Sequence, residues 1–222
     1  AFKFGAAPFH MWIPDVYHGS LITTTLLLST APKIAIFIIL IKLLGLVFSG
    51  LVIFWSDILQ ILAVLSIIIG NITAIAQTNI KRMLAYSTIA NIGFILLALS
   101  IGSYDSFVAS MFYTLTYIMT TILAFGLLSE LFSNDKAIEE IKDLSGLAKS
   151  NPLVAFMIMT IMLSYVGIPP FLGFHAKLFV IQSLVQSSNI LLSVFAVIMT
   201  VIGSYYYLRV IKIMYFDDLN NA

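Results

Sequence analysis

The chain has 222 residues, of which 61% are hydrophobic and only 9% are charged, and its mean hydropathy is +1.07. A soluble domain carries about 25% charged residues, so this composition excludes a soluble domain and indicates an integral membrane protein. The net charge of +1 gives no reason to expect a nucleic-acid partner. The sequence has no cysteine, which excludes disulfides and cysteine-ligated iron–sulfur clusters in this chain.

A helical span needs ~20 apolar residues, so we predict an all-α membrane protein with about seven transmembrane helices. The whole chain, 1–222, is expected to form one transmembrane domain. We expect residues 1–11 to be the end of a span and 12–19 (WIPDVYHG) to form a polar turn. The uninterrupted spans that follow are expected at about 20–48, 52–76, 83–101, 106–132 and 189–214.

The segment 133–151 is the only hydrophilic stretch of any length. Within it Ile138, Ile141, Leu144 and Leu147 recur every three residues. This spacing predicts an amphipathic loop or helix on the membrane surface.

The segment 152–188 is too long for one straight span, and it carries the sequence GIPP near its middle. Proline removes a backbone donor and clashes one turn back, and the residue before a proline avoids the helical region. We therefore predict a discontinuous helix with a break near 167–173. Non-helical backbone at membrane depth needs protein or water to satisfy its polar groups.

The loop charges predict the orientation of the chain. If loops alternate between the two membrane surfaces, one surface collects Lys81, Arg82, Lys136, Lys142, Lys149, Arg209 and Lys212. The positive-inside rule places that surface on the cytoplasmic or matrix side.

Three lysines lie within apolar runs beside proline or glycine: Lys3, Lys33 and Lys177. An unpaired charge at the bilayer centre costs about 2.5–3.5 kcal/mol on insertion scales, so such a lysine must face a protein interior, a partner or water. Burial disfavours the charged form of a lysine and a neighbouring carboxylate favours it, which suits an amine that gives and takes protons. These three lysines are the predicted proton-transfer residues, and each is expected to come with a proline-containing segment that opens a helix and admits water. The alternative is a simple kink or a snorkelling side chain.

Two histidines are weaker candidates for the same pathway. His10 lies seven residues after Lys3, and a polar contact at a helix end is an equal alternative. His175 lies two residues before Lys177, so the two side chains point to different faces of a regular helix, and a packing or water contact is favoured. Tyr205, Tyr206 and Tyr207 are interpreted as an interfacial aromatic belt rather than as proton carriers.

Four segments carry a family resemblance: FKFGAAPFHMWIPDVYHGSLITTTLLLSTAPKIAIF, NIKRMLAYSTIANIGF, NPLVAFMIMTIMLSYVGIPPFLGFHAKLFV and SYYYLRVIKIMYF. In this order they resemble the central lysine region, the following segment, the second broken helix and the penultimate helix of the antiporter-like subunits of respiratory complex I. PDVYHG and YYYLRV are most similar to the subunit 2 branch of that family, called subunit N in bacteria.

The resemblance implies the second half of a fourteen-helix fold, from the seventh helix to the thirteenth. Lys3 matches the family's central lysine, Lys33 its relay lysine and Lys177 the lysine of its second broken helix. The implied function is proton translocation within NADH:ubiquinone oxidoreductase. Electron transfer would belong to other subunits, with no cofactor or redox centre in this chain. The implied location is the mitochondrial inner membrane, or alternatively a bacterial plasma membrane.

The sequence departs from the family at three places. The family's glutamate partner for the central lysine lies on an earlier helix, the last family helix is absent, and Asn91 stands where many members have histidine. We therefore expect a separate polypeptide that supplies the first six helices, beside other membrane-arm subunits and lipid. The rival interpretations are a subunit of a multi-protein Na⁺/H⁺ antiporter or membrane-bound hydrogenase, and a purely structural membrane-arm subunit.

Overall fold

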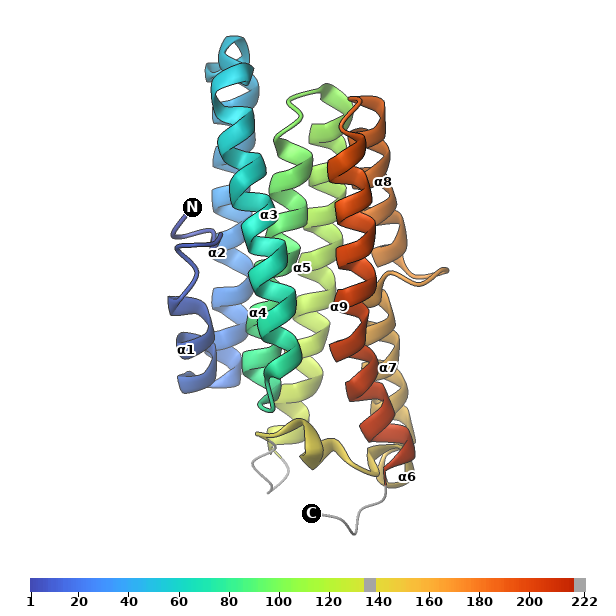
Figure 1. Ribbon diagram of the computed structural model, residues 1–222. Coiled ribbons are helices and arrows are strands. Elements are labelled where there is room, and N and C mark those ends of the chain that lie inside the picture. The colour runs from blue at the N-terminus through green and yellow to red at the C-terminus, as the bar shows by residue number, and fades with distance from the viewer. Residues whose placement is uncertain (134–138, 218–222) are drawn as a thin grey trace.

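A computed structural model describes residues 1–133 and 139–217 of the chain, and Figure 1 shows them as a bundle of helices. No β-strand occurs in this part of the chain. The α-helices are α1 Trp12–Gly19, α2 Ile22–Lys42, α3 Val52–Ala76, α4 Ile80–Leu99, α5 Tyr104–Ser133, α6 Leu147–Ser150, α7 Pro152–Val166, α8 Leu172–Gln186 and α9 Ile190–Phe216. The predicted all-α class is confirmed.

Five helical stretches of the described residues are long and apolar enough to cross a membrane: 22–47, 49–76, 80–99, 104–131 and 190–216. Four of them, all except 80–99, have outer faces with exposed large apolar side chains such as Ile53 and Leu191. A helix satisfies its own backbone hydrogen bonds, so these faces can lie directly against lipid. The chain is therefore a multi-pass membrane protein.

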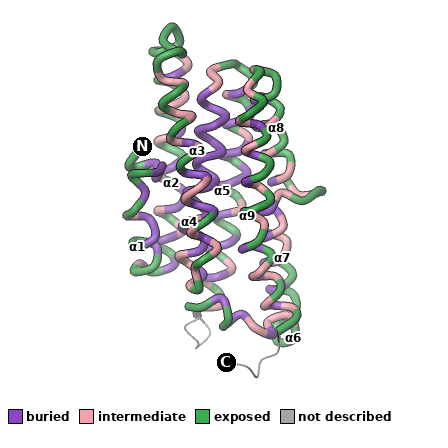
Figure 2. Tube along the Cα trace, viewed as in Figure 1, coloured by how far each residue is buried: buried purple, intermediate pink, exposed green. Residues whose placement is uncertain are grey.

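The centre of the bundle is α4, in which every residue from Ser87 to Leu99 is buried. Figure 2 shows this helix largely in the colour of buried residues. The helix packs against α1, α3, α5 and α8. Small residues, among them Gly70 of α3 and Ala90 and Gly93 of α4, line the α3–α4 contact. Small side chains let two backbones approach closely, which is the usual basis of helix association in membranes.

The first nineteen residues differ from the prediction. Residues 1–11 form hydrogen-bonded turns instead of the end of a regular span, because Pro8 cannot donate to a helical ladder. Residues 12–19 form α1 instead of a polar turn. Pro14 lies in the first turn of that helix, where a backbone N–H has no helical partner to lose. Ile13 and Tyr17 are buried on its inner side.

The predicted break is confirmed between α7 and α8. Gly167 ends α7 with φ of 84°, a left-handed conformation that favours glycine, and α8 begins at Leu172. Each half has 15 residues, or about 22 Å of helix, which is too short to cross a hydrocarbon core of about 30 Å. Figure 1 shows the two halves end to end, with the break near the middle of the bundle. Together they make one further crossing.

The start of α8 lies directly against the end of α7. A Cβ atom at Gly173 would lie 1.8 Å from the backbone oxygen of Ser164. Only a residue without a side chain fits at this position, so Gly173 fixes how closely the two half-helices overlap.

Lys33 lies in a helix that is not broken. Although Pro32 sits inside α2, the helix continues from Ile22 to Lys42 and then as a π-turn to Val47. The expectation that every lysine comes with an opened helix therefore holds for Lys177 but not for Lys33. Pro32 has no backbone N–H, so one helical hydrogen bond is missing, but the helix does not end there.

The positively charged loops gather at one end of the bundle. In Figure 1 the α3–α4 connection, the segment before α7 and the C-terminal end of α9 all lie at the lower end. Arg82 forms an ion pair of 3.1 Å with Asp15 there, and Arg209 donates to the carbonyl oxygens of Ile75 and Gln77. Lys136 lies outside the described residues.

The expected amphipathic segment 133–151 is described only in part, because 134–138, with Ile138, lie outside the described residues. Its later part contains a 3₁₀-helix, Ile141–Leu144, followed by α6. Ile141 and Leu144 are buried against the bundle, so the apolar side of this segment faces protein.

The glycine at the helix break yields a first prediction. Gly173→Ala should push α8 away from α7 and lower the free energy of unfolding by about 1–3 kcal/mol, the usual cost of overpacking. Thermal unfolding of the purified membrane complex, followed through this chain, measures the effect. Gly50→Ala is the matched control, because a Cβ at Gly50 meets nothing within 4 Å. Equal melting temperatures for the two variants would contradict the proposed fit.

Candidate functional site

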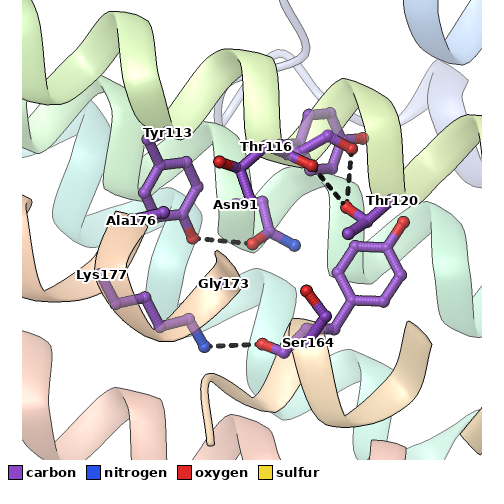
Figure 3. A pocket seen from close by; sticks show the side chains of 10 residues that line it. Asn91, Tyr113, Thr116, Thr120, Ser164, Gly173, Ala176 and Lys177 are labelled. Atoms are coloured by element: carbon purple, nitrogen blue, oxygen red, sulfur yellow. Dashed lines mark hydrogen bonds between the residues drawn. The ribbon is translucent and has the colours of Figure 1, made fainter. Parts of the chain in front are cut away.

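The Lys177 ammonium is bound to the broken end of α7. Its Nζ donates to the backbone oxygens of Tyr165, at 2.8 Å, and Val166, at 3.0 Å. Figure 3 shows the side chain reaching from α8 toward the end of α7. The last carbonyls of a helix have no helical partner and carry the negative end of its dipole. The break therefore supplies a site for a cation that needs no carboxylate.

Lys33 is held by two phenols. Its side chain is 3% exposed, and its Nζ lies 3.2 Å from the hydroxyl of Tyr17 on α1 and 3.4 Å from that of Tyr117 on α5. The same nitrogen lies 5.7 Å and 5.5 Å from the centres of these two rings, within the range of cation–π attraction. No carboxylate pairs with Lys33 within residues 1–133 and 139–217.

Hydroxyl groups continue from Lys33 toward α7. The Tyr117 hydroxyl donates to Oγ1 of Thr88 at 2.9 Å. One turn along α5, Oγ1 of Thr121 lies 3.0 Å from the Tyr165 hydroxyl and donates to the Tyr117 carbonyl. Tyr165 carries one of the carbonyls that bind Lys177. Side chains from α2, α4, α5, α7 and α8 thus form a polar tract between the two lysines.

A second group of polar side chains surrounds Asn91 on α4. The hydroxyl of Tyr113 donates to Asn91 Oδ1 at 2.8 Å, and Asn91 Nδ2 donates to the Ser87 carbonyl at 2.8 Å. The hydroxyls of Tyr207 and Ser87 lie 2.5 Å apart. Since every polar atom of the Asn91 amide is engaged, this buried network is satisfied.

Two small cavities adjoin Lys177 and Asn91. One has a volume of about 20 Å³ and is also lined by Tyr113, Tyr117 and Ser164 (Figure 3). The other has a volume of about 10 Å³ and lies toward α3 and α9. A space of roughly 10–15 Å³ admits one water molecule when polar partners are present. Both cavities are therefore of a size for single water molecules within the tract.

Lys3 and His10 do not line either cavity beside Lys177. The Lys3 side chain is exposed, and it has no ion-pair partner in the part of the chain that is described. His10 is buried, and its Nδ1 has no hydrogen-bond partner among the described residues. Proton transfer by these two residues stays a prediction.

His175 is exposed and packs edge-on against the neighbouring Phe174 ring. It does not line either cavity beside Lys177, in line with the opposite faces expected from its spacing. Its role in proton transfer also stays a prediction. The described residues contain no group of three or more His, Asp or Glu side chains that could hold a metal ion.

The tyrosines are the main site residues that the sequence analysis missed. The interpretation of Tyr206 and Tyr207 as an interfacial belt is wrong, because both are fully buried and hydrogen-bonded, Tyr206 to Asn71 and Tyr207 to Ser87. Tyr205 is 56% exposed and remains compatible with a belt. A usable signal existed in α5, where Tyr113, Tyr117 and Thr121 recur every four residues and so share one helix face.

Comparison with known proteins gives a consistent result. The family described as NADH:quinone oxidoreductase/Mrp antiporter, transmembrane, matches residues 1–203. NADH-quinone oxidoreductase subunit N of Thioalkalivibrio sulfidiphilus is 49% identical over 217 residues, which are 98% of this chain and 45% of that protein. The chain thus spans less than half the length of the curated relatives that it matches.

Two solved structures agree in fold. A chain of respiratory complex I from Thermus thermophilus with bound aureothin matches with a TM-score of 0.82 and 34% identity, over 97% of this chain and 47% of that one. A chain of the Mrp complex from Dietzia sp. DQ12-45-1b matches with a TM-score of 0.91 and 23% identity, over 98% and 40%. The chain belongs to the NADH:quinone oxidoreductase/Mrp antiporter transmembrane family.

Proposed function

We propose that this chain is part of a proton-translocating membrane-arm subunit in an NADH:quinone oxidoreductase, and that protons pass through Lys33 and Lys177. The family and the subunit N relatives support this assignment. The observation that carries it is the pair of lysines inside the bundle, both held by dipoles rather than by carboxylates.

Dipoles suit a group that must change its charge. A salt bridge stabilises the ammonium strongly, and its remaining carboxylate is left unpaired when the amine becomes neutral. A carbonyl or a phenol oxygen can accept a hydrogen bond from the ammonium. When the lysine is neutral, the same oxygen can accept a hydrogen bond from water or from another hydroxyl. The Lys177 ammonium on the end of α7 and the Lys33 ammonium between two phenols fit this requirement.

The energies are of the right size for pumping. Moving one charge across 100 mV requires about 2.3 kcal/mol. A hydrogen bond to a charged group contributes about 1.5–3 kcal/mol. Making or breaking one such bond, for example between Lys177 and the Tyr165 carbonyl, therefore changes the energy of a proton on the lysine by an amount comparable to the work of translocation.

Electron transfer belongs to other subunits in this proposal, and the chain itself carries no redox centre or cofactor. Its partners are other membrane-arm subunits and lipid. The curated relatives are bacterial, which supports the bacterial plasma membrane over the mitochondrial inner membrane.

The nearest second candidate is a subunit of a multi-protein cation/proton antiporter, since an Mrp complex has the same fold. The identities favour the oxidoreductase, with 49% to a subunit N against 23% to the Mrp chain. Co-purification with a flavin-containing, NADH-oxidising arm distinguishes the two. A purely structural subunit would be expected to have apolar helix interiors, which does not agree with the buried Lys33 ammonium.

Substitution of Lys33 tests the proposed function. In the assembled complex, Lys33→Ala should lower the rate of proton pumping, because the buried amine is lost. The rate is measured as the pH change inside proteoliposomes during NADH oxidation. Lys33→Arg should impair it as well, since a guanidinium hardly releases its proton.

Lys42→Ala is the matched control, because Lys42 is an exposed lysine on the same helix. Its rate should equal that of the wild type when both are normalised to the amount of assembled complex. Normal proton pumping in an assembled Lys33→Ala complex would refute the proposed function.

Lys3 yields a separate prediction. In the full assembly a carboxylate from outside these 222 residues should lie near the Lys3 ammonium, directly or through one water, because an unpaired charge inside the membrane is costly. A structure of the assembled complex provides the check. If only lipid or apolar side chains surround Lys3, its role as the central charge site fails.

A further inference from the structure

We propose that the Tyr117 hydroxyl passes protons between Lys33 and the cavity beside Lys177, whereas Tyr17 only positions Lys33. This inference rests on the proposed function and names a residue that acts within it. The two tyrosines resemble each other closely, which makes the difference between them informative.

Both phenols contact Lys33, and both are buried. Tyr17 is 0% exposed and Tyr117 is 4% exposed, and their hydroxyls lie 3.2 Å and 3.4 Å from Lys33 Nζ. Of the two, Tyr117 alone lines the cavity of about 20 Å³ that Lys177 also lines. It is therefore placed to exchange a proton with Lys33 on one side and with a water molecule in that cavity on the other.

A phenol passes a proton without keeping a charge. One N–H bond of the Lys33 ammonium breaks as a new O–H bond forms on Tyr117, and the original Tyr117 proton moves to a water oxygen in the cavity. Lys33 becomes neutral, the phenol is unchanged, and the water carries the proton toward Lys177. The reverse sequence recharges Lys33, so the same step serves both directions.

Thr88 controls the starting orientation of this hydroxyl. In the structure the Tyr117 O–H donates to Thr88 Oγ1, and Thr88 in turn donates to the Leu84 carbonyl at 2.9 Å. A carbonyl oxygen has no proton to pass on, so this branch ends there. Proton transfer requires the Tyr117 O–H to turn from Thr88 toward the cavity, and Thr88 thus holds the hydroxyl in a position that does not conduct.

The test compares matched substitutions in the assembled complex. Tyr117→Phe and Tyr17→Phe each remove one hydroxyl from Lys33 and keep the ring. Tyr117→Phe should lower the rate of proton pumping by as much as Lys33→Ala lowers it. Tyr17→Phe should lower the rate much less.

Proteoliposome pH changes during NADH oxidation, normalised to assembled complex, provide the measurement. If Tyr117→Phe assembles poorly, Tyr117→Phe combined with Thr88→Val removes both partners and avoids an unsatisfied buried group; it should also lower the rate by as much as Lys33→Ala lowers it. Equal effects of Tyr117→Phe and Tyr17→Phe, or normal pumping by Tyr117→Phe where Lys33→Ala is impaired, would overturn the inference. Normal pumping by Lys33→Ala would instead overturn the proposed function.

Discussion

An ammonium group inside a membrane must exchange its hydration shell for fixed dipoles, and the organisation of this bundle follows from that requirement. Lys177 meets it with the carbonyls that a helix end leaves without partners. Lys33 meets it with two phenols, in a helix that stays intact. The Lys177 site requires a broken helix and the Lys33 site does not. At both sites the amine can lose its proton without leaving a carboxylate unpaired.

The helix break and its packing serve the first of these solutions. A continuous helix through Val166 would use its carbonyl oxygen internally, so α7 must end inside the bundle to expose it. Gly167 and Gly173 permit this ending, one through a left-handed backbone and the other through a close approach to Ser164. The polar side chains around α4 and α5 then have to pair with one another, because the membrane provides no water to satisfy them.

Hydropathy, proline and lysine positions were sufficient to predict the long spans, the break near 167–173, the buried Lys33 and the half-buried Lys177. The spans depend on the hydropathy of about 20 consecutive residues. The break depends on the backbone conformations that proline and the residue before it can adopt. The helical state of 12–19 was not predicted, because Pro14 fits the first turn of a helix as well as it fits a turn. Whether Pro32 would break α2 was equally undetermined by local sequence.

The hydroxyl tract could not be predicted in the same way. A tyrosine suits a membrane interface and a hydrogen-bonded core alike, so the run Tyr205–Tyr207 does not reveal which rings point inward. The partners settle that question, and they come from distant segments: Tyr206 meets Asn71 and Tyr207 meets Ser87. The same holds for Lys33, whose contacts lie on α1 and α5.

In this proposal one hydrated polar tract joins Lys33 to Lys177 through Tyr117. A structure of the assembled complex at a resolution that reveals ordered water tests this connection. We expect a water molecule in the cavity between Tyr117 and Lys177, within hydrogen-bonding distance of the Tyr117 hydroxyl or of a group bonded to it. A cavity filled by apolar side chains or lipid, with no water between these residues, would rule the connection out.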